Sequence, residues 1–136
     1  MLNIKSNPPI EEILRNCKSI AVVGFSPKEN RPSHIVGKYL MAAGFTVYPI
    51  NPGVHEILGQ ISYPDLASIP GPVDVVDIFR RSEDIYPIVE AAIAIQAKVI
   101  WMQQGIVNDV AAALAEKAGL QVVMDRCIKI DHANMN

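Results

Sequence analysis

Short apolar runs alternate along the chain with stretches in which apolar residues recur every three or four positions. The short runs predict β-strands over residues 19–23, 46–50, 73–79, 98–102 and 120–124. The periodic stretches predict amphipathic helices over residues 32–43, 84–95 and 108–118. A further helix is expected over residues 8–16. Between residues 56 and 70 we expect a short edge strand near 60–63 and one helical turn.

The order of these elements predicts the fold class. Asp84 and Asn108 are expected N-caps, and Gly44 and Gly119 follow last helical turns. Strands that are apolar on both faces and separated by helices need a parallel sheet covered on both sides. We therefore expect an α/β fold: a Rossmann-like, doubly wound, mainly parallel sheet of five to six strands with helices on both faces. No repeat or linker interrupts the sequence, so residues 1–136 are interpreted as one domain.

Ligands of such sheets bind outside the carboxyl ends of the strands, so the loops there should decide function. The first loop, "GFSPKENRP", starts at Gly24, which permits a tight turn or a close approach of a ligand. Ser26 and the N–H groups of the following helix can donate to a phosphate, and Lys28 and Arg31 add positive charge. An ordinary strand-to-helix turn would also explain this loop.

More cations follow the third apolar run. Arg80 and Arg81 are adjacent, so we expect at most one of them to reach a given ligand and the other to pair with Glu83 or Asp84. A solvated charged loop is the alternative interpretation.

The second strand end lacks the acidic residue that NAD-binding folds place on the ribose, and no G-x-G-x-x-G follows the first strand. Asn51 and Pro52 instead offer a hydrogen-bonding group and a flat ring against which an adenine could lie. The Pro-Gly pair could equally form a simple turn.

Apolar and amide side chains mark the third and fourth strand ends. Phe79, Trp101 and Met102 could form a surface for an uncharged, flexible chain, although Trp101 could equally belong to the core. Gln103 and Gln104 could meet a carbonyl or amide group of that chain.

The overall composition leaves room for a sizeable core and excludes a generally basic surface. Of the 136 residues, 50% are hydrophobic, and the net charge is −2, so nucleic-acid and membrane binding are not expected. No apolar stretch reaches the roughly 20 residues that span a bilayer, and the N-terminal residues lack the apolar core of a signal peptide. We expect a cytoplasmic protein.

Candidate nucleophiles lack partners in the sequence. Cys17 and Cys127 form no zinc or disulfide pattern; Cys17 is expected to pack in the core, whereas Cys127 follows the last strand and is either a reactive thiol or buried. No G-x-S-x-G elbow surrounds Ser26, and His34 is interpreted as a surface histidine at a helix start. No catalytic pair or metal site is predicted.

Four blocks in this order, "IAVVGFSPKENRPSHIVGKYL", "VYPINPGVHEILGQISYPDLASIPGPVDVVDIFRRSE", "KVIWMQQGIVND" and "AGLQVVMDRCIKIDH", carry a family resemblance. The chain resembles the CoA-binding domain family, the small stand-alone relatives of the N-terminal domain of the succinyl-CoA synthetase alpha subunit. The likeness runs from about Ser19 to Asp131.

The resemblance implies a protein that binds coenzyme A, or an acyl-CoA, at the carboxyl edge of its sheet. Residues that match the family's ligand contacts are Gly24, Phe25 and Ser26 for the phosphates, Pro52 for adenosine, Phe79 beside them, and Trp101, Met102 and Gln103 along the pantetheine arm. Arg31, Asn51 and Arg80 are added from their charge or hydrogen-bonding capacity.

The chain departs from the synthetase, because "SPKENRPS" replaces the second glycine of the phosphate loop. We also expect no ligase domain with its phosphorylated histidine and no nucleotide grasp domain, so no catalytic activity is assigned. The alternatives are an NAD(P)-binding oxidoreductase and an acyl-CoA enzyme that uses Cys127 or Ser26. A protein partner or a homodimer remains open.

Overall fold

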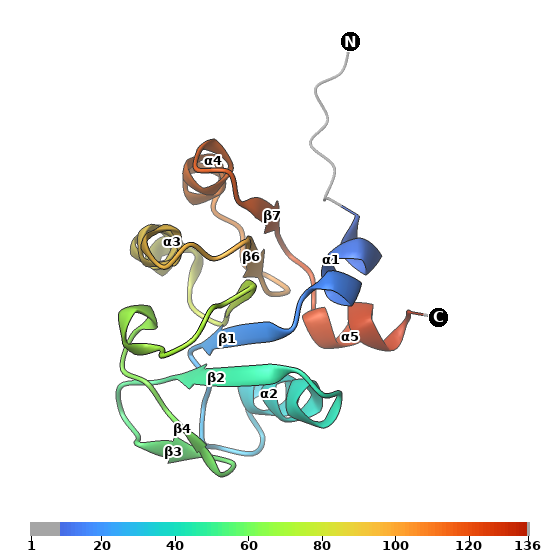
Figure 1. Ribbon diagram of the computed structural model, residues 1–136, viewed down its shortest axis with the longest axis vertical. Helices are drawn as coiled ribbons and strands as arrows, with labels where there is room; N and C mark the ends of the chain where they lie inside the picture. The colour runs from blue at the N-terminus through green and yellow to red at the C-terminus, as the bar shows by residue number, and fades with distance from the viewer. Residues whose placement is uncertain (1–8, 136) are drawn as a thin grey trace.

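The computed structural model describes residues 9–135 and shows one twisted sheet between two layers of helices (Figure 1). Its five strands are β1 (Ser19–Val23), β2 (Thr46–Ile50), β5 (Val75–Ile78), β6 (Val99–Met102) and β7 (Gln121–Val123). The α-helices are α1 (Ile10–Asn16), α2 (Pro32–Ala42), α3 (Ile85–Ala94), α4 (Asp109–Lys117) and α5 (Ile128–Ala133).

The strand order places the expected ligand edge. All neighbours in the sheet are parallel, and the order is β2-β1-β5-β6-β7. The chain therefore leaves β1 for β2 on one side and returns to build β5, β6 and β7 on the other. The point at which the order reverses lies between the carboxyl ends of β1 and β5, the usual position of a ligand in open α/β sheets.

Alternate side chains of the strands point to opposite faces of the sheet and pack in two separate hydrophobic cores. One core packs α3 and α4 against residues such as Val76 and Ile100, and the other packs α1, α2 and α5 against residues such as Val75 and Trp101. In Figure 1 these two sets of helices lie on opposite sides of the sheet. The predicted α/β, Rossmann-like, doubly wound fold is confirmed, with five strands in the main sheet.

The five predicted strands and the three predicted long helices are all present, with ends that differ by up to two residues. The predicted helical turn is a 3-10 turn over Leu66–Ser68. The expected opening helix begins at Ile10; its predicted first residue, Pro8, lies outside the described residues.

The short strand predicted near residues 60–63 is present, but it does not join the edge of the main sheet. β3 (Glu56–Ile57) and β4 (Gln60–Ile61) pair with each other as a small antiparallel hairpin outside the main sheet. Tyr63 reaches the main sheet through an isolated parallel bridge to Ile50.

The two expected N-caps behave differently. The Asn108 side chain accepts a hydrogen bond from the N–H of Ala111 at 2.9 Å, so this cap is confirmed. The Asp84 side chain makes no cap bond, because a 3-10 turn over Ser82–Asp84 leads into α3 and its carboxylate pairs with arginine instead. Within residues 9–135, no helix has both the length and the apolar character to cross a membrane.

Candidate functional site

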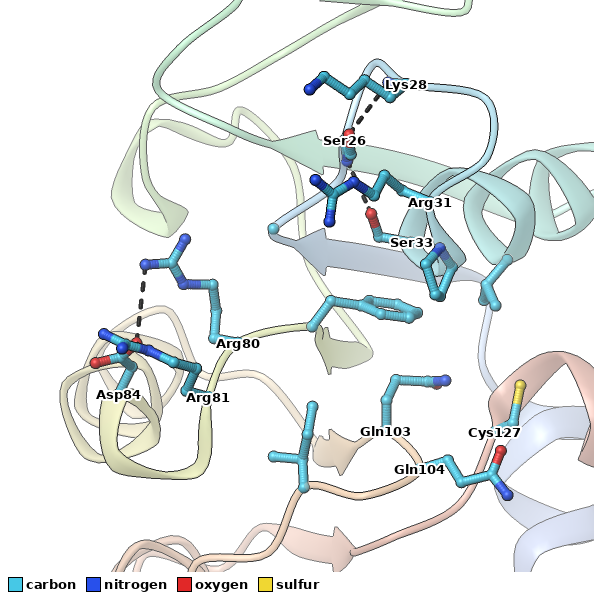
Figure 2. A pocket seen from close by; sticks show the side chains of 15 residues that line it. Ser26, Lys28, Arg31, Ser33, Arg80, Arg81, Asp84, Gln103, Gln104 and Cys127 are labelled. Atoms are coloured by element: carbon cyan, nitrogen blue, oxygen red, sulfur yellow. Dashed lines mark hydrogen bonds and ion pairs between the residues drawn. The ribbon is translucent and has the colours of Figure 1, made fainter.

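A cleft of about 960 Å³ opens at the carboxyl edge of the sheet, where the strand order reverses. Its walls come from the ends of β1, β5 and β6, the first turn of α2, and the segment that precedes α5 (Figure 2). The lining residues are Gly24, Ser26, Lys28, Arg31, Pro32, Ser33, Val36, Phe79, Arg80, Arg81, Asp84, Gln103, Gln104, Ile106 and Cys127.

Gly24 brings the ends of β1 and β5 together at the base of this cleft. Its φ of 86° lies in the left-handed region, and a Cβ there would come within 2.6 Å of the Phe79 carbonyl oxygen. Glycine is the residue that tolerates both conditions. The loop that begins at Gly24 therefore starts directly beside the backbone that carries Arg80.

Two serines hold the first loop against the start of α2. The N–H of Ser26 donates to Ser33 Oγ at 2.9 Å, and Ser26 Oγ accepts the N–H of Lys28 at 3.1 Å. Since its oxygen is the acceptor in that bond, the Ser26 hydroxyl keeps its proton for another partner.

The expectation of a surface histidine at position 34 is wrong. His34 is buried: its Nδ1 lies 2.9 Å from the Ser26 carbonyl oxygen, and its ring meets the edge of Phe25. The imidazole satisfies a carbonyl of the loop and so takes part in fixing the loop's shape.

Four cations surround one end of the cleft. Figure 2 shows Lys28 and Arg31 on one side and Arg80 and Arg81 on the other. The Arg81 Nε lies 3.2 Å from Asp84 Oδ2, a hydrogen bond that raises the pKa of Arg81, while Arg80 is 3.9 Å from the same oxygen. Within residues 9–135, the side chains of Lys28 and Arg31 have no acidic partner.

The opposite end of the cleft is uncharged. Gln103, Gln104 and Cys127 lie there together in Figure 2. Phe79 and Ile106 add apolar surface to the cleft. Gln103 is only 4% exposed, and its Oε1 accepts the N–H of Ile128 at 3.1 Å. The cleft thus changes from cationic to neutral along its length.

The structure brings together six of the eleven predicted ligand-binding residues. Gly24, Ser26, Arg31, Phe79, Arg80 and Gln103 all line the cleft.

The remaining five lie elsewhere. The side chains of Phe25, Trp101 and Met102 are fully buried in the core, where the Phe25 ring packs so closely on Gly37 that a Cβ there would overlap it.

Asn51 and Pro52 lie beyond the cleft. The Asn51 amide is occupied on both sides, because Nδ2 donates to the Phe25 carbonyl and Oδ1 accepts the N–H of Gly53. Pro52 is exposed and does not line the cleft.

Sequence reasoning missed Pro32, Ser33, Val36 and Ile106 as lining residues. Ser33 follows the proline that starts α2, a position whose N–H has no partner within the helix, and this signal could have found it. Val36 and Ile106 belong to segments that the sequence placed at this edge, the helix after the first loop and the loop after the fourth strand, but neither residue was singled out.

Other reactive groups lie away from the cleft. Burial, together with the charge of Asp74, raises the pKa of the Cys17 thiol to about 11, and this residue packs in the core as predicted. Asp77, in β5, is fully buried with neither carboxylate oxygen hydrogen-bonded. Among residues 9–135, no group of three or more His, Cys, Asp or Glu residues is placed to hold a metal ion.

The fold and the cleft together define a class. A parallel, doubly wound sheet with its cleft at the reversal of strand order is a Rossmann-like domain, and such domains bind ligands at this edge. A profile of the family described as CoA binding domain matches residues 18–133. The chain belongs to this CoA-binding domain family.

The chain is similar to several known proteins over most of its length. The uncharacterized protein YneT of Bacillus subtilis is 43% identical over 128 residues, 94% of this chain and 95% of YneT. A solved hypothetical protein from Pyrococcus horikoshii is 40% identical with a TM-score of 0.89, over 96% of this chain and 97% of that one. A dinucleotide-forming acetyl-coenzyme A synthetase of Ca. Korarchaeum cryptofilum is 26% identical with a TM-score of 0.73, over 82% of this chain but 26% of the synthetase.

Proposed function

We propose that the chain binds coenzyme A, or an acyl-CoA, in the cleft at the carboxyl edge of the sheet. The observation that carries this proposal is the division of the cleft into a cationic end and a neutral end. Coenzyme A has the same division, since phosphates crowd its nucleotide half and uncharged amides run along its pantetheine arm. Membership of the CoA-binding domain family supports the same ligand.

The phosphates bind at the end formed by Lys28, Arg31 and Arg80. A hydrogen bond between a charged side chain and a phosphate contributes about 1.5 to 3 kcal/mol. Arg31 has the largest expected effect, because no carboxylate competes for it within the described residues. The Ser26 hydroxyl and the first turn of α2 add neutral donors at the same end.

The pantetheine arm lies along Phe79 and ends near Gln103 and Cys127. Phe79 offers an apolar wall, and the Gln103 amide offers a donor for a carbonyl of the arm. Phe25, Trp101 and Met102 support this path from the core rather than touching the ligand. A contact between adenine and Pro52 or Asn51 is a separate prediction, because neither residue lines the cleft.

No catalytic activity is part of this proposal. Ser26 lacks a general base, since His34 is directed at the Ser26 backbone carbonyl and not at its hydroxyl. The synthetase with the related fold is a much longer chain, of which this one covers 26%. An NAD(P)-dependent oxidoreductase is the competing function, and nucleotide titrations separate the two.

Titration calorimetry with coenzyme A tests the proposal. We expect micromolar binding, about 8 kcal/mol, and a loss of about tenfold to 100-fold in Arg31→Ala. Arg80→Ala should lose less, because Asp84 lies 3.9 Å from this arginine. Arg15→Ala is the matched control, since Arg15 pairs with Glu11 on α1 and does not line the cleft.

Two further ligands sharpen the result. Dephospho-CoA should bind more weakly than coenzyme A, and the arginine whose removal abolishes that difference is the one that meets the 3′-phosphate. NADH should bind much more weakly than either. Equal affinities for coenzyme A in the wild type and in both cleft variants, or a preference for NADH, would overturn the proposal.

A further inference from the structure

Cys127 occupies the neutral end of the cleft with its backbone fixed on both sides. The Trp101 indole N–H donates to the Arg126 carbonyl at 2.8 Å, and the N–H of Arg126 contacts the Met102 carbonyl at 3.4 Å. On the other side, the N–H of Ile128 donates to Gln103 Oε1. The thiol is therefore presented to the cleft by residues held to the end of β6.

The amide of Gln103 has one free side. Because a backbone N–H can only donate, the atom that it meets is the Gln103 oxygen, so Nε2 is the other end of the amide. Within residues 9–135, no residue accepts a hydrogen bond from this Nε2, although Gln103 as a whole is only 4% exposed. Figure 2 shows the nitrogen turned into the cleft, on the side where the Cys127 sulfur lies.

An unpaired donor of this kind points to a ligand with an acceptor beside the thiol. The last amide carbonyl of the pantetheine arm is such an acceptor, and only a short methylene link separates that amide from the ligand's sulfur. A carbonyl held by Gln103 Nε2 would keep the ligand's sulfur in the part of the cleft that Cys127 lines.

We propose that Cys127 forms a mixed disulfide with the thiol end of coenzyme A by exchange with CoA disulfide. This inference rests on the proposed function. The Cys127 thiolate attacks one sulfur of CoA disulfide, a new S–S bond forms to that sulfur, and the original S–S bond breaks. The second CoA leaves as a thiolate with the electron pair and takes a proton from water. Cys127 is oxidised, one CoA is released as the reduced thiol, and another thiol reverses the step.

The chain contains its own reference cysteine. Cys17 is 8% exposed, lies in the core beside α1, and has a pKa raised to about 11, so it holds little thiolate at neutral pH. A non-specific reaction of disulfides with exposed thiols would not depend on the nucleotide half of the reagent. A reaction that follows binding in the cleft would depend on that half.

The test treats reductant-free protein with CoA disulfide or with glutathione disulfide at the same concentration. Intact mass follows the adduct, and peptide mass mapping locates it. We expect one CoA per chain on Cys127, formed about tenfold or more faster than the glutathione adduct, because binding raises the local concentration of the reagent. The adduct should be absent in Cys127→Ser, present in Cys17→Ser, and released by dithiothreitol.

Mapping on the wild type keeps the test decisive if the Cys127→Ser variant does not fold. An adduct on Cys17, equal rates for the two disulfides, or no adduct would overturn the inference. Calorimetry of the wild type with coenzyme A under a phosphine reductant is run in parallel. Binding in this titration, together with no Cys127 adduct in the CoA disulfide reaction, overturns the inference alone, whereas no binding overturns the proposed function as well.

Discussion

Arg80 and Arg81 follow each other in the sequence but end in different electrostatic surroundings. Both line the cleft, yet Arg81 donates to Asp84 at 3.2 Å and also lies 3.9 Å from Glu83. Arg80 has only the same Asp84 oxygen, at 3.9 Å. The sequence predicted that one of the pair would meet a carboxylate, and alternation along the strand favoured neither. The geometry of the Ser82–Asp84 turn selects Arg81.

Asp77 is a carboxylic acid in the hydrophobic interior of the sheet. It is fully buried in β5 between Val22 and Trp101 of the neighbouring strands, and neither of its carboxylate oxygens has a hydrogen-bond partner in the described part of the chain. Burial raises the pKa of Asp77 well above its ordinary value. The folded protein therefore keeps this carboxyl protonated at pH values at which the unfolded chain has released the proton.

The different protonation of Asp77 in the folded and unfolded states predicts that stability depends on pH. As pH rises above about 4, the ordinary pKa of Asp, the unfolded state binds fewer protons than the folded state. Asp77 then lowers the free energy of unfolding by about 1.4 kcal/mol per pH unit until the folded-state pKa is reached. We expect the stability of Asp77→Asn relative to wild type to increase with pH by that slope, as measured by urea unfolding between pH 4 and 6.

Asp74→Asn serves as the control of opposite sign. Burial pushes the pKa of Asp74 upward, but the backbone N–H groups of Lys18 and Ser19 and the Lys98 ammonium outweigh it, so the net shift is downward. The stability that Asp74 contributes is present above its unfolded pKa of about 4 and is lost as pH falls below that value, so Asp74→Asn should change little relative to wild type between pH 4 and 6. A difference between Asp77→Asn and wild type that does not change with pH would contradict the assignment of a protonated Asp77.

At the level of single residues, the sequence correctly predicted cleft residues in the loops that follow the strands. It was wrong for large apolar side chains that pack in the core instead of lining the cleft. Gly24 and Gln103 follow strands directly and Ser26 is the third residue after β1, so their position at the carboxyl edge is fixed by the fold. Trp101 and Met102 belong to β6 itself and point into the two cores. Whether a large apolar side chain at a strand end faces a ligand or the core depends on the covering helices, which a strand pattern does not contain.

The helix starts show the same limit at the level of elements. Asn108 and Asp84 both have the residue type of an N-cap, but only Asn108 has the backbone and the free side-chain oxygen that capping needs. The Asn108 amide also donates to the Ser82 carbonyl at 2.9 Å, so it ties α4 to the turn before α3.

This contrast predicts unequal effects of two similar substitutions. Asn108→Ala should lower the free energy of unfolding by about 1 to 2 kcal/mol, because the N-cap hydrogen bond and the hydrogen bond to the Ser82 carbonyl are both lost. Asp84→Ala should cost at most about 1 kcal/mol, because its carboxylate makes only ion pairs at the surface. Chemical denaturation of the two variants beside wild type measures the difference. Equal losses, or a larger loss for Asp84→Ala, would contradict this account of the helix starts.

Helix α5 is an α-helix that the sequence did not predict. It has six residues, too few to show a helical period, and its stability comes from contacts far away in the sequence. The Tyr39 hydroxyl lies 2.7 Å from His132 Nδ1, and Ile128 is fully buried among the residues of α1 and α2. The order of the longer elements, by contrast, could be predicted because each has its own repeat of apolar residues.

At the scale of the whole molecule, a chain of net charge −2 concentrates four cations around one end of one cleft. This placement follows from topology: parallel strands deliver the loops after β1 and β5 to the same edge, and the reversal of strand order separates the covering helices there. The same topology brings the loop after β6 and the start of α5 to the neutral end. We propose that this polarity orients a CoA molecule.

A crystal structure of the protein grown with coenzyme A tests that claim most directly. We predict that the phosphates lie against Lys28, Arg31 and Arg80, and that the sulfur lies beside Gln103 and Cys127. A reversed ligand, with its phosphates at the glutamines, would contradict the account. So would a CoA molecule bound on another face while the cleft stays empty.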